Sequence, residues 1–280
     1  MSQVNYGSAD AVVSRMPSPS IWNDCPLESI ILDPSKGRHL FEDFTAGVVA
    51  DATVVLGQRN GLTAYCESDD ATDVALQADD EGTVILTTDA TDADVTCIVD
   101  GDNTSGLWKT PTAGNAKGLW FEARIKSTSV TNGDFGFFVG LAQPGEAKDA
   151  GGCQGADAAT LADVDYVGFA MKSGDADDLL IAYNEAGAGT AQASDDAIDI
   201  TINTWMRVGF KVVTKSQGTY VQFYVDGEYL GSAYDVDLTG TNANWPGATD
   251  MNVTISITAD GAAAVTDGIY VDWVRVATTN

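Results

Sequence analysis

The chain has 280 residues, and 14 Lys and Arg side chains against 41 Asp and Glu side chains give it a formal net charge of −27. Such a charge repels nucleic-acid phosphates and anionic membrane surfaces, so we expect neither as a partner. Hydrophobic residues make up 44% of the chain, which allows a sizeable core and excludes wholesale disorder. All-β sandwiches often reach this length as a single domain.

The first forty residues differ from the rest of the chain. They hold four of the seven prolines and show no sustained periodicity, so we interpret residues 1–40 as an extended N-terminal arm ahead of a domain at 41–280. Its apolar side chains suit docking onto another surface: Ile21, Trp22, Leu27, Ile30, Ile31 and Leu32. Two interpretations stay open, because the arm can dock onto a partner or pack on its own domain.

The opening residues lack the basic start and apolar core of a secretory signal, and no stretch approaches the length of a membrane span. We therefore expect a protein that is made and kept in a cytosol, although a chain stripped of its signal would look the same. The four cysteines, Cys25, Cys66, Cys97 and Cys153, are widely spaced, which favours free buried thiols over disulfides. The single histidine, His39, leaves almost no scope for histidine-based metal sites or proton relays.

From Phe41 onward the pattern is one of short strands separated by Gly, Asp and Asn. At 119–126 the side chains of Leu119, Phe121, Ala123 and Ile125 share one face, and the same period-2 alternation recurs at 207–212, 220–225 and 253–258. The dipeptide Asp226-Gly227 predicts a two-residue hairpin turn. No window of about twelve residues or more has a convincing helical period, so we predict an all-β, antiparallel domain.

Three segments carry a family resemblance: residues 118–142 (GLWFEARIKSTSVTNGDFGFFVGLA), residues 204–232 and residues 269–277 (IYVDWVRVA). Together they resemble the concanavalin A-like superfamily, which includes laminin-G domains and family-16-type β-glucanases. The resemblance covers roughly residues 41–277. It implies a two-sheet antiparallel jelly-roll sandwich, and it specifies the fold far better than the function.

The enzymes of that superfamily place Glu-x-Asp-x-x-Glu on one strand, and the matching residues here, 163–168, read Asp-Val-Asp-Tyr-Val-Gly. Asp163 takes the nucleophile position with a shorter side chain, whereas Gly168 takes the acid/base position and carries no proton. Retaining hydrolysis needs both carboxyl groups. The sequence also lacks a Gly-x-Ser-x-Gly elbow, a P-loop and a dinucleotide fingerprint. We therefore expect no enzymatic activity, no catalytic residues and no cofactor.

Metal and sugar sites have weaker signals. Asp100-Gly101-Asp102-Asn103 gathers oxygen donors as a calcium site does, but a strand-joining turn has the same composition, and we assign no metal residues. The 12 acidic residues between Asn60 and Trp108, with no Lys or Arg, are either a cation-binding surface or, as we favour, a solvated sheet face. Trp245 lies in a polar loop and is our candidate platform for sugar binding, whereas the other tryptophans of the domain fit packing roles.

An acidic sandwich without a signal, preceded by an apolar arm, is similar to structural proteins of tailed bacteriophages. This resemblance implies a virion component, made in the host cytoplasm, that decorates a capsid or forms a head fibre and docks through its arm. The expected partners are a capsid or other virion protein, further copies of the chain in a homo-oligomer, and a cell-surface glycan. The alternative is a lectin-like module that binds carbohydrate.

Overall fold

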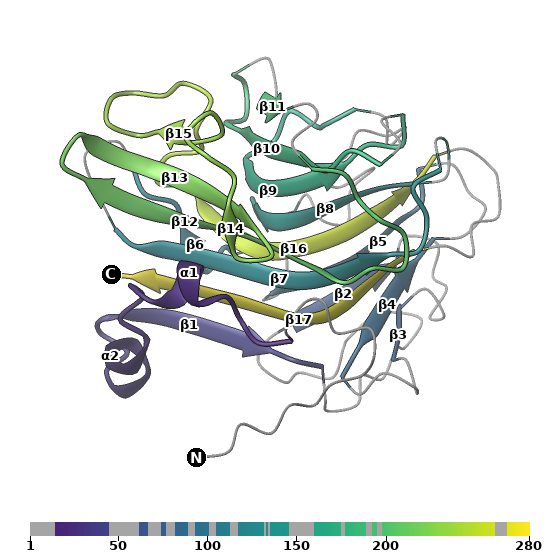
Figure 1. The fold of residues 1–280 in the computed structure, drawn as a ribbon, viewed down its shortest axis with the longest axis horizontal. Helices are drawn as coiled ribbons and strands as arrows, with labels where there is room; N and C mark the ends of the chain where they lie inside the picture. The colour runs from purple at the N-terminus through teal and green to yellow at the C-terminus, as the bar shows by residue number, and fades with distance from the viewer. Residues whose placement is uncertain are drawn as a thin grey trace.

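The computed structural model describes most of the chain, and the following statements concern that part only. The described residues are 15–44, 62–66, 74–76, 82–88, 93–100, 105–112, 117–131, 133, 135–145, 160–174, 177–188, 192–194, 198–260 and 268–280. They form two antiparallel sheets that pack face to face, with the N-terminal segment lying across one of them (Figure 1). Among these residues no helix has the length and hydropathy needed to cross a bilayer.

We name the first sheet sheet A. In spatial order its strands are β14 (Glu228–Tyr229), β13 (Gly218–Val225), β12 (Met206–Lys215), β7 (Leu119–Ser127), β17 (Gly268–Thr279), β4 (Val84–Thr87) and β3 (Val74–Leu76). Two further strands join it at the sides: β1 (Gly37–Glu42) pairs with β17, and β15 (Val236–Asp237) pairs with β13.

The second sheet is sheet B. Its strands, in spatial order, are β11 (Gln192–Ser194), β10 (Leu180–Asn184), β9 (Tyr166–Met171), β8 (Phe135–Ala142), β16 (Asp250–Ala259), β5 (Val95–Asp100) and β2 (Leu62–Cys66). The short strand β6 (Trp108–Lys109) pairs with the start of β16. The two sheets confirm the predicted all-β antiparallel sandwich.

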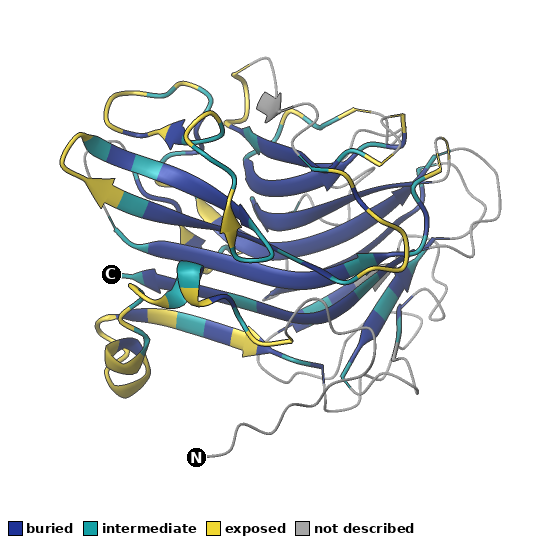
Figure 2. Cartoon of the chain, in the orientation of Figure 1, coloured by how far each residue is buried: buried dark blue, intermediate teal, exposed yellow. Residues whose placement is uncertain are grey.

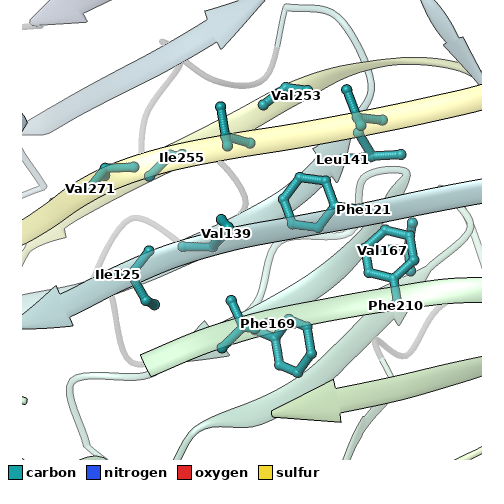
Figure 3. Close-up of a cluster of buried hydrophobic side chains, with 14 of the residues drawn as sticks. Phe121, Ile125, Val139, Leu141, Val167, Phe169, Phe210, Val253, Ile255 and Val271 are labelled. Carbon is teal, nitrogen blue, oxygen red and sulfur yellow. The ribbon is translucent and has the colours of Figure 1, made fainter. Parts of the chain in front are cut away.

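The core lies between the sheets and is built from the alternating apolar residues of both. Phe121 and Phe210 of sheet A stack with their ring centroids 5.1 Å apart, and Phe169 of sheet B meets Phe223 of sheet A edge to face at 5.8 Å. Figure 3 shows side chains from both sheets gathered in this layer. The face predicted from the alternation at 119–126 is confirmed, because Leu119, Phe121, Ala123 and Ile125 all belong to the core cluster.

The predicted hairpin at Asp226-Gly227 is also confirmed. These two residues join β13 to β14, and their φ angles are 52° and 82°. Positive φ at both central positions defines the turn whose twist matches that of the flanking strands. The sequence signal was reliable here because glycine and aspartate tolerate this backbone region better than most residues.

The N-terminal segment is not an extended arm where the structure describes it. It forms helices α1 (Pro19–Trp22) and α2 (Leu27–Leu32), which lie beside the strands of sheet A (Figure 1). Ile21 and Ile30 share a buried cluster with Trp120 and Tyr224 on the outer face of that sheet. Residues 37–40, which the sequence division assigned to the arm, belong to β1 of sheet A. Of the two interpretations left open, packing on the chain's own domain holds for residues 15–36.

Candidate functional site

The outer face of sheet B, the face turned away from the core, carries the strand that the family resemblance singles out. Paired residues of β16, β8, β9 and β10 form three rows across this face: Asn252, Ala142, Tyr166 and Asn184; Thr254, Gly140, Gly168 and Ala182; Ser256, Phe138, Ala170 and Leu180. With strands about 4.8 Å apart, each row of four spans roughly 14 Å. All of these residues are buried, as the dark blue strands of Figure 2 show.

The two glycines of the middle row, Gly140 and Gly168, leave room for an aromatic ring. A Cβ atom at Gly168 would stand 2.7 Å from the Cα atom of Gly140 and 3.0 Å from Cζ of Phe138, and it would also collide with the carbonyl oxygen of Val139. The Phe138 ring contacts Tyr166 edge to face, with centroids 5.6 Å apart. Gly168, which we read as a missing catalytic acid, is therefore the residue that makes room for Phe138.

The two aspartates of the motif lie just before β9 and organise a neighbouring turn. The carboxylate of Asp163 accepts hydrogen bonds from Nδ2 of Asn184 (3.0 Å) and from the backbone amide of Gly187 (3.1 Å). The carboxylate of Asp165 accepts one from the backbone amide of Ala186 (2.7 Å). Both aspartates thus hold the turn that follows β10. The outward positions of β9, which are Tyr166, Gly168 and Ala170, carry no carboxylate.

The ends of the rows hold polar side chains that sequence reasoning did not single out. Asn252 is 1% exposed, and neither its Oδ1 nor its Nδ2 finds a hydrogen-bond partner in the described part of the chain. The same holds for Oγ of Ser256 and Oδ1 of Asn184. A buried polar group left unpaired costs about 1–3 kcal/mol, so such groups call for an explanation. The one signal in the sequence was the polar side of the alternation at 253–258.

Trp245, the predicted sugar platform, is not exposed. Only 2% of its surface is accessible, and its ring packs 6.3 Å from that of Tyr183. Its Nε1 donates a hydrogen bond to the carbonyl oxygen of Pro111 at 2.8 Å. The polar neighbours of Trp245 in the sequence suggested a surface loop, but the loop folds back and the indole fills the edge of the core. The prediction of an exposed platform was wrong.

The six predicted docking residues separate into two groups. Ile21 and Ile30 are buried on sheet A, Trp22 is half-buried with Nε1 donating to Glu122 (2.6 Å), and Leu27 is half-buried. Ile31 and Leu32 remain exposed, at 61% and 76%. Ile31 and Leu32 are therefore the two of the six that are most available to a partner, whereas Ile21 and Ile30 are occupied by the chain's own sheet A.

Sheet A carries buried charges beneath the N-terminal segment. The carboxylate of Glu122 accepts hydrogen bonds from the backbone amide of Ser18 (2.9 Å) and from Trp22. Burial raises the pKa of Glu122, while these hydrogen bonds oppose the shift. The Arg124 guanidinium donates to Asp272 at 2.5 Å. This face is closed by the chain itself and offers no open site at these residues.

Of the candidate calcium turn, only the first residue belongs to the described part of the chain. Asp100 is buried, and its carboxylate accepts hydrogen bonds from the indole of Trp108 and the backbone amide of Val253. Burial raises the pKa of Asp100 to about 7, against the opposing effect of these hydrogen bonds. Residues 101–103 lie outside the described part. Within the described residues no three or more His, Cys, Asp or Glu side chains form a metal-binding group.

Two other sequence expectations reach only a few described residues. Of the acidic residues between Asn60 and Trp108, only Asp94 and Asp100 are described, and both are buried rather than solvated as we expected. Cys25 is a half-buried thiol outside any disulfide, and burial raises its pKa to about 11. Cys97 is buried on sheet B, while Cys153 and the side chain of Cys66 lie outside the described part.

Comparison with solved structures identifies the fold. The chain is similar to an endo-1,3-β-glucanase from Streptomyces sioyaensis (TM-score 0.58, 12% identity, covering 88% of this chain and 98% of that one). It is also similar to a protein of unknown function from Shewanella oneidensis (TM-score 0.53, 14% identity, 91% and 94% covered) and to the carbohydrate recognition domain of Emp47p (TM-score 0.52, 9% identity, 87% and 97% covered). No protein-family model and no curated protein matches the sequence. The fold is a concanavalin A-like β-sandwich.

We predict that Gly168→Ala destabilises the protein by about 1–3 kcal/mol, because the added methyl group meets backbone that cannot move aside. Gly174→Ala is the matched control, since nothing lies within 4 Å of a Cβ atom at that position. Urea unfolding monitored by fluorescence gives both values. Equal midpoints for the two variants would show that the contact between Gly168 and Phe138 does not constrain the sheet.

Proposed function

We propose that this protein is a carbohydrate-binding module of the lectin type, that it does not hydrolyse glycans, and that it binds through the outer face of sheet B. The observation that carries the proposal is the set of buried, unpaired polar groups on that face, foremost the side-chain amide of Asn252. The fold supports the same class of function. Two of the structurally similar proteins are an endo-1,3-β-glucanase and a carbohydrate recognition domain.

The chemistry of this face suits a sugar. An amide side chain offers both an acceptor and donors, which match the hydroxyl groups of a sugar ring, and Asn252 and Asn184 stand at opposite ends of one row. Tyr166 lies between them and Phe138 contacts it, which adds the aromatic surface that sugar sites commonly use. A row of roughly 14 Å accommodates more than one sugar ring.

Binding on this face requires a local opening. Leu161 and Val164 pack against the cluster that contains Phe138 and Tyr166, and both are only partly buried. A glycan reaches Asn252 and Asn184 only when side chains above the rows move aside. Such movement on binding is common in recognition sites that are closed in the free protein.

We propose that the protein does not hydrolyse glycans because of the residues on β9 and just before it. Retaining hydrolysis needs two carboxyl groups about 5–5.5 Å apart on opposite sides of the scissile bond. The outward positions of β9 are Tyr166, Gly168 and Ala170, and the carboxylates of Asp163 and Asp165 are committed to the turn after β10. A glutamate at position 168 would collide with Val139 and Phe138.

The proposal predicts that Asn252→Leu abolishes glycan binding without lowering stability. Leucine keeps a similar volume and removes an unpaired amide, so the free energy of unfolding stays level or rises by about 1 kcal/mol. Asn23→Leu, at an exposed position on the side of sheet A, is the control and retains binding. A glycan array identifies the ligand, calorimetry compares its affinity, and thermal melts compare stability. Wild-type protein that binds no glycan, or Asn252→Leu that binds as well as wild type, defeats the proposal.

A virion role is the second candidate, and the exposed apolar pair on α2 supports it. Ile31 and Leu32 are adjacent, exposed and outside the contacts that tie α1 and α2 to sheet A. In this role the protein is made in the host cytoplasm, docks on a bacteriophage capsid through α2 and displays the sandwich, as a homo-oligomer. The docking element is then α2 rather than the whole arm, because Ile21 and Ile30 are buried on the chain's own sheet.

The docking role predicts that the double variant Ile31→Asp and Leu32→Asp stays folded and no longer binds undecorated capsids. Substitutions at such exposed positions change stability by only about 0.5 kcal/mol. Ile202→Asp, at another exposed apolar residue, controls for added charge. Co-sedimentation with the capsids measures binding. Full binding by the double variant would exclude docking through α2.

A further inference from the structure

A pocket of about 400 Å³ opens at the end of the sandwich where α2, β1 and β6 meet. Its walls are mainly apolar and include Ile31, Leu40, Leu107 and Trp108. Two of these, Ile31 and Leu107, are exposed, whereas Leu40 and Trp108 are buried in the core. The volume is at the small end of ligand pockets, which gives room for a short aliphatic chain rather than a folded segment of protein.

The polar groups of the pocket have distinct environments. Arg38 is exposed, and one of its guanidinium N–H groups donates to the carbonyl oxygen of Leu107 at 3.1 Å. A guanidinium has five such donors arranged to match a carboxylate. His39 accepts a hydrogen bond from Nε of Arg275 (3.2 Å), and burial, followed by the charge of Arg275, lowers its pKa to about 4. Asp100 is buried.

The charge of the surroundings favours an anion at Arg38 in particular. The chain as a whole carries −27, so cations are scarce and an anionic ligand is repelled from most of the surface. At this pocket Arg38 lines the wall, and Lys36, two residues before it in the chain, is exposed. The pocket therefore offers apolar walls to the hydrocarbon part of a ligand and the positive charge of Arg38 to its anionic end.

We propose that this pocket binds an aliphatic carboxylate, with the hydrocarbon chain against Ile31, Leu40 and Leu107 and the carboxylate on the guanidinium of Arg38. This site is separate from the rows on the outer face of sheet B and does not depend on the carbohydrate proposal. The hydrocarbon chain covers the exposed side chains of Ile31 and Leu107 beside the buried Leu40, and the charge-assisted hydrogen bonds of Arg38 fix its orientation.

Binding depends on pH through Asp100. The charged and titratable groups that line the pocket are Arg38 and His39 on β1 and Asp100 at the end of β5; α2, Pro34 and β6 contribute uncharged side chains. His39 stays neutral near neutral pH, because its pKa is lowered to about 4. Asp100, whose pKa burial raises to about 7, gains its charge there and repels the ligand. The affinity therefore falls from about pH 6 to about pH 8.

The test uses two probes of equal length and opposite charge, octanoate and octylammonium, with the full-length protein. His39 is the only histidine of the chain and lines the pocket, so the proton resonances of its ring report binding at this site directly. We expect octanoate to shift these resonances and octylammonium to leave them unchanged. Arg38→Gln weakens octanoate binding on the order of tenfold, while Lys109→Gln, on β6, does not.

Each other outcome overturns the proposal. Binding of octylammonium in preference to octanoate would make Asp100 the recognising group. Calorimetric binding of octanoate without a shift of the His39 resonances would place the ligand elsewhere. Equal affinity in wild type and Arg38→Gln, with Leu107→Ser also unchanged, would show that neither the guanidinium nor the apolar wall takes part.

Discussion

The buried charges on the outer face of sheet A constrain the whole N-terminal part of the chain. Glu122 is fully buried, and Asp272 is nearly so and pairs with both Arg124 and Arg15. A buried charge that loses its partner costs about 3–5 kcal/mol, so these groups need their hydrogen bonds in the folded protein. The segment before β1 supplies them, through the amide of Ser18, the indole of Trp22 and the guanidinium of Arg15.

A local irregularity of β17 makes this arrangement possible. Its pairing with β7 shifts register between Val271 and Trp273, so that one extra residue stands between the core side chains of Val271 and Val274. Asp272 and Trp273 consequently both reach the N-terminal segment: Asp272 pairs with Arg15, and Nε1 of Trp273 donates to the carbonyl oxygen of Arg15. Bulges commonly redirect side chains in this way.

The two outer faces consequently differ in their surroundings. The chain's own N-terminal segment covers part of sheet A and binds the carboxylate of Glu122 there, although Oγ of Ser18 and Nε of Arg124 and of Arg207 have no hydrogen-bond partner among the described residues. Sheet B keeps unpaired amide and hydroxyl groups beside the contact between Phe138 and Tyr166. The outer face of sheet B and the pocket at Arg38 are therefore better candidates for ligand binding than the surface under α1.

Local patterns predicted the strands well because each pattern depends on few neighbours. The alternation around Phe121 and the Asp226-Gly227 turn are properties of adjacent residues, and both are confirmed. The burial of Trp245 was missed, and that of Ile21 was left open, because it depends on residues far away in the chain: Pro111 for Trp245, and Trp120 and Tyr224 of sheet A for Ile21. Gly168 was recognised as a departure from the enzymes, but its reason, the ring of Phe138, exists only in three dimensions.

The most direct test of this account is amide hydrogen exchange in Glu122→Gln, with Glu228→Gln on the exposed strand β14 as control. Oε2 of Glu122 accepts from both Ser18 and Trp22. Glutamine keeps the shape of the side chain but removes the negative charge that strengthens these two bonds, and it leaves a single acceptor oxygen. The account predicts that amides of residues 18–30 exchange on the order of tenfold faster, while the central strands keep their protection. Unchanged exchange over residues 18–30 would contradict it.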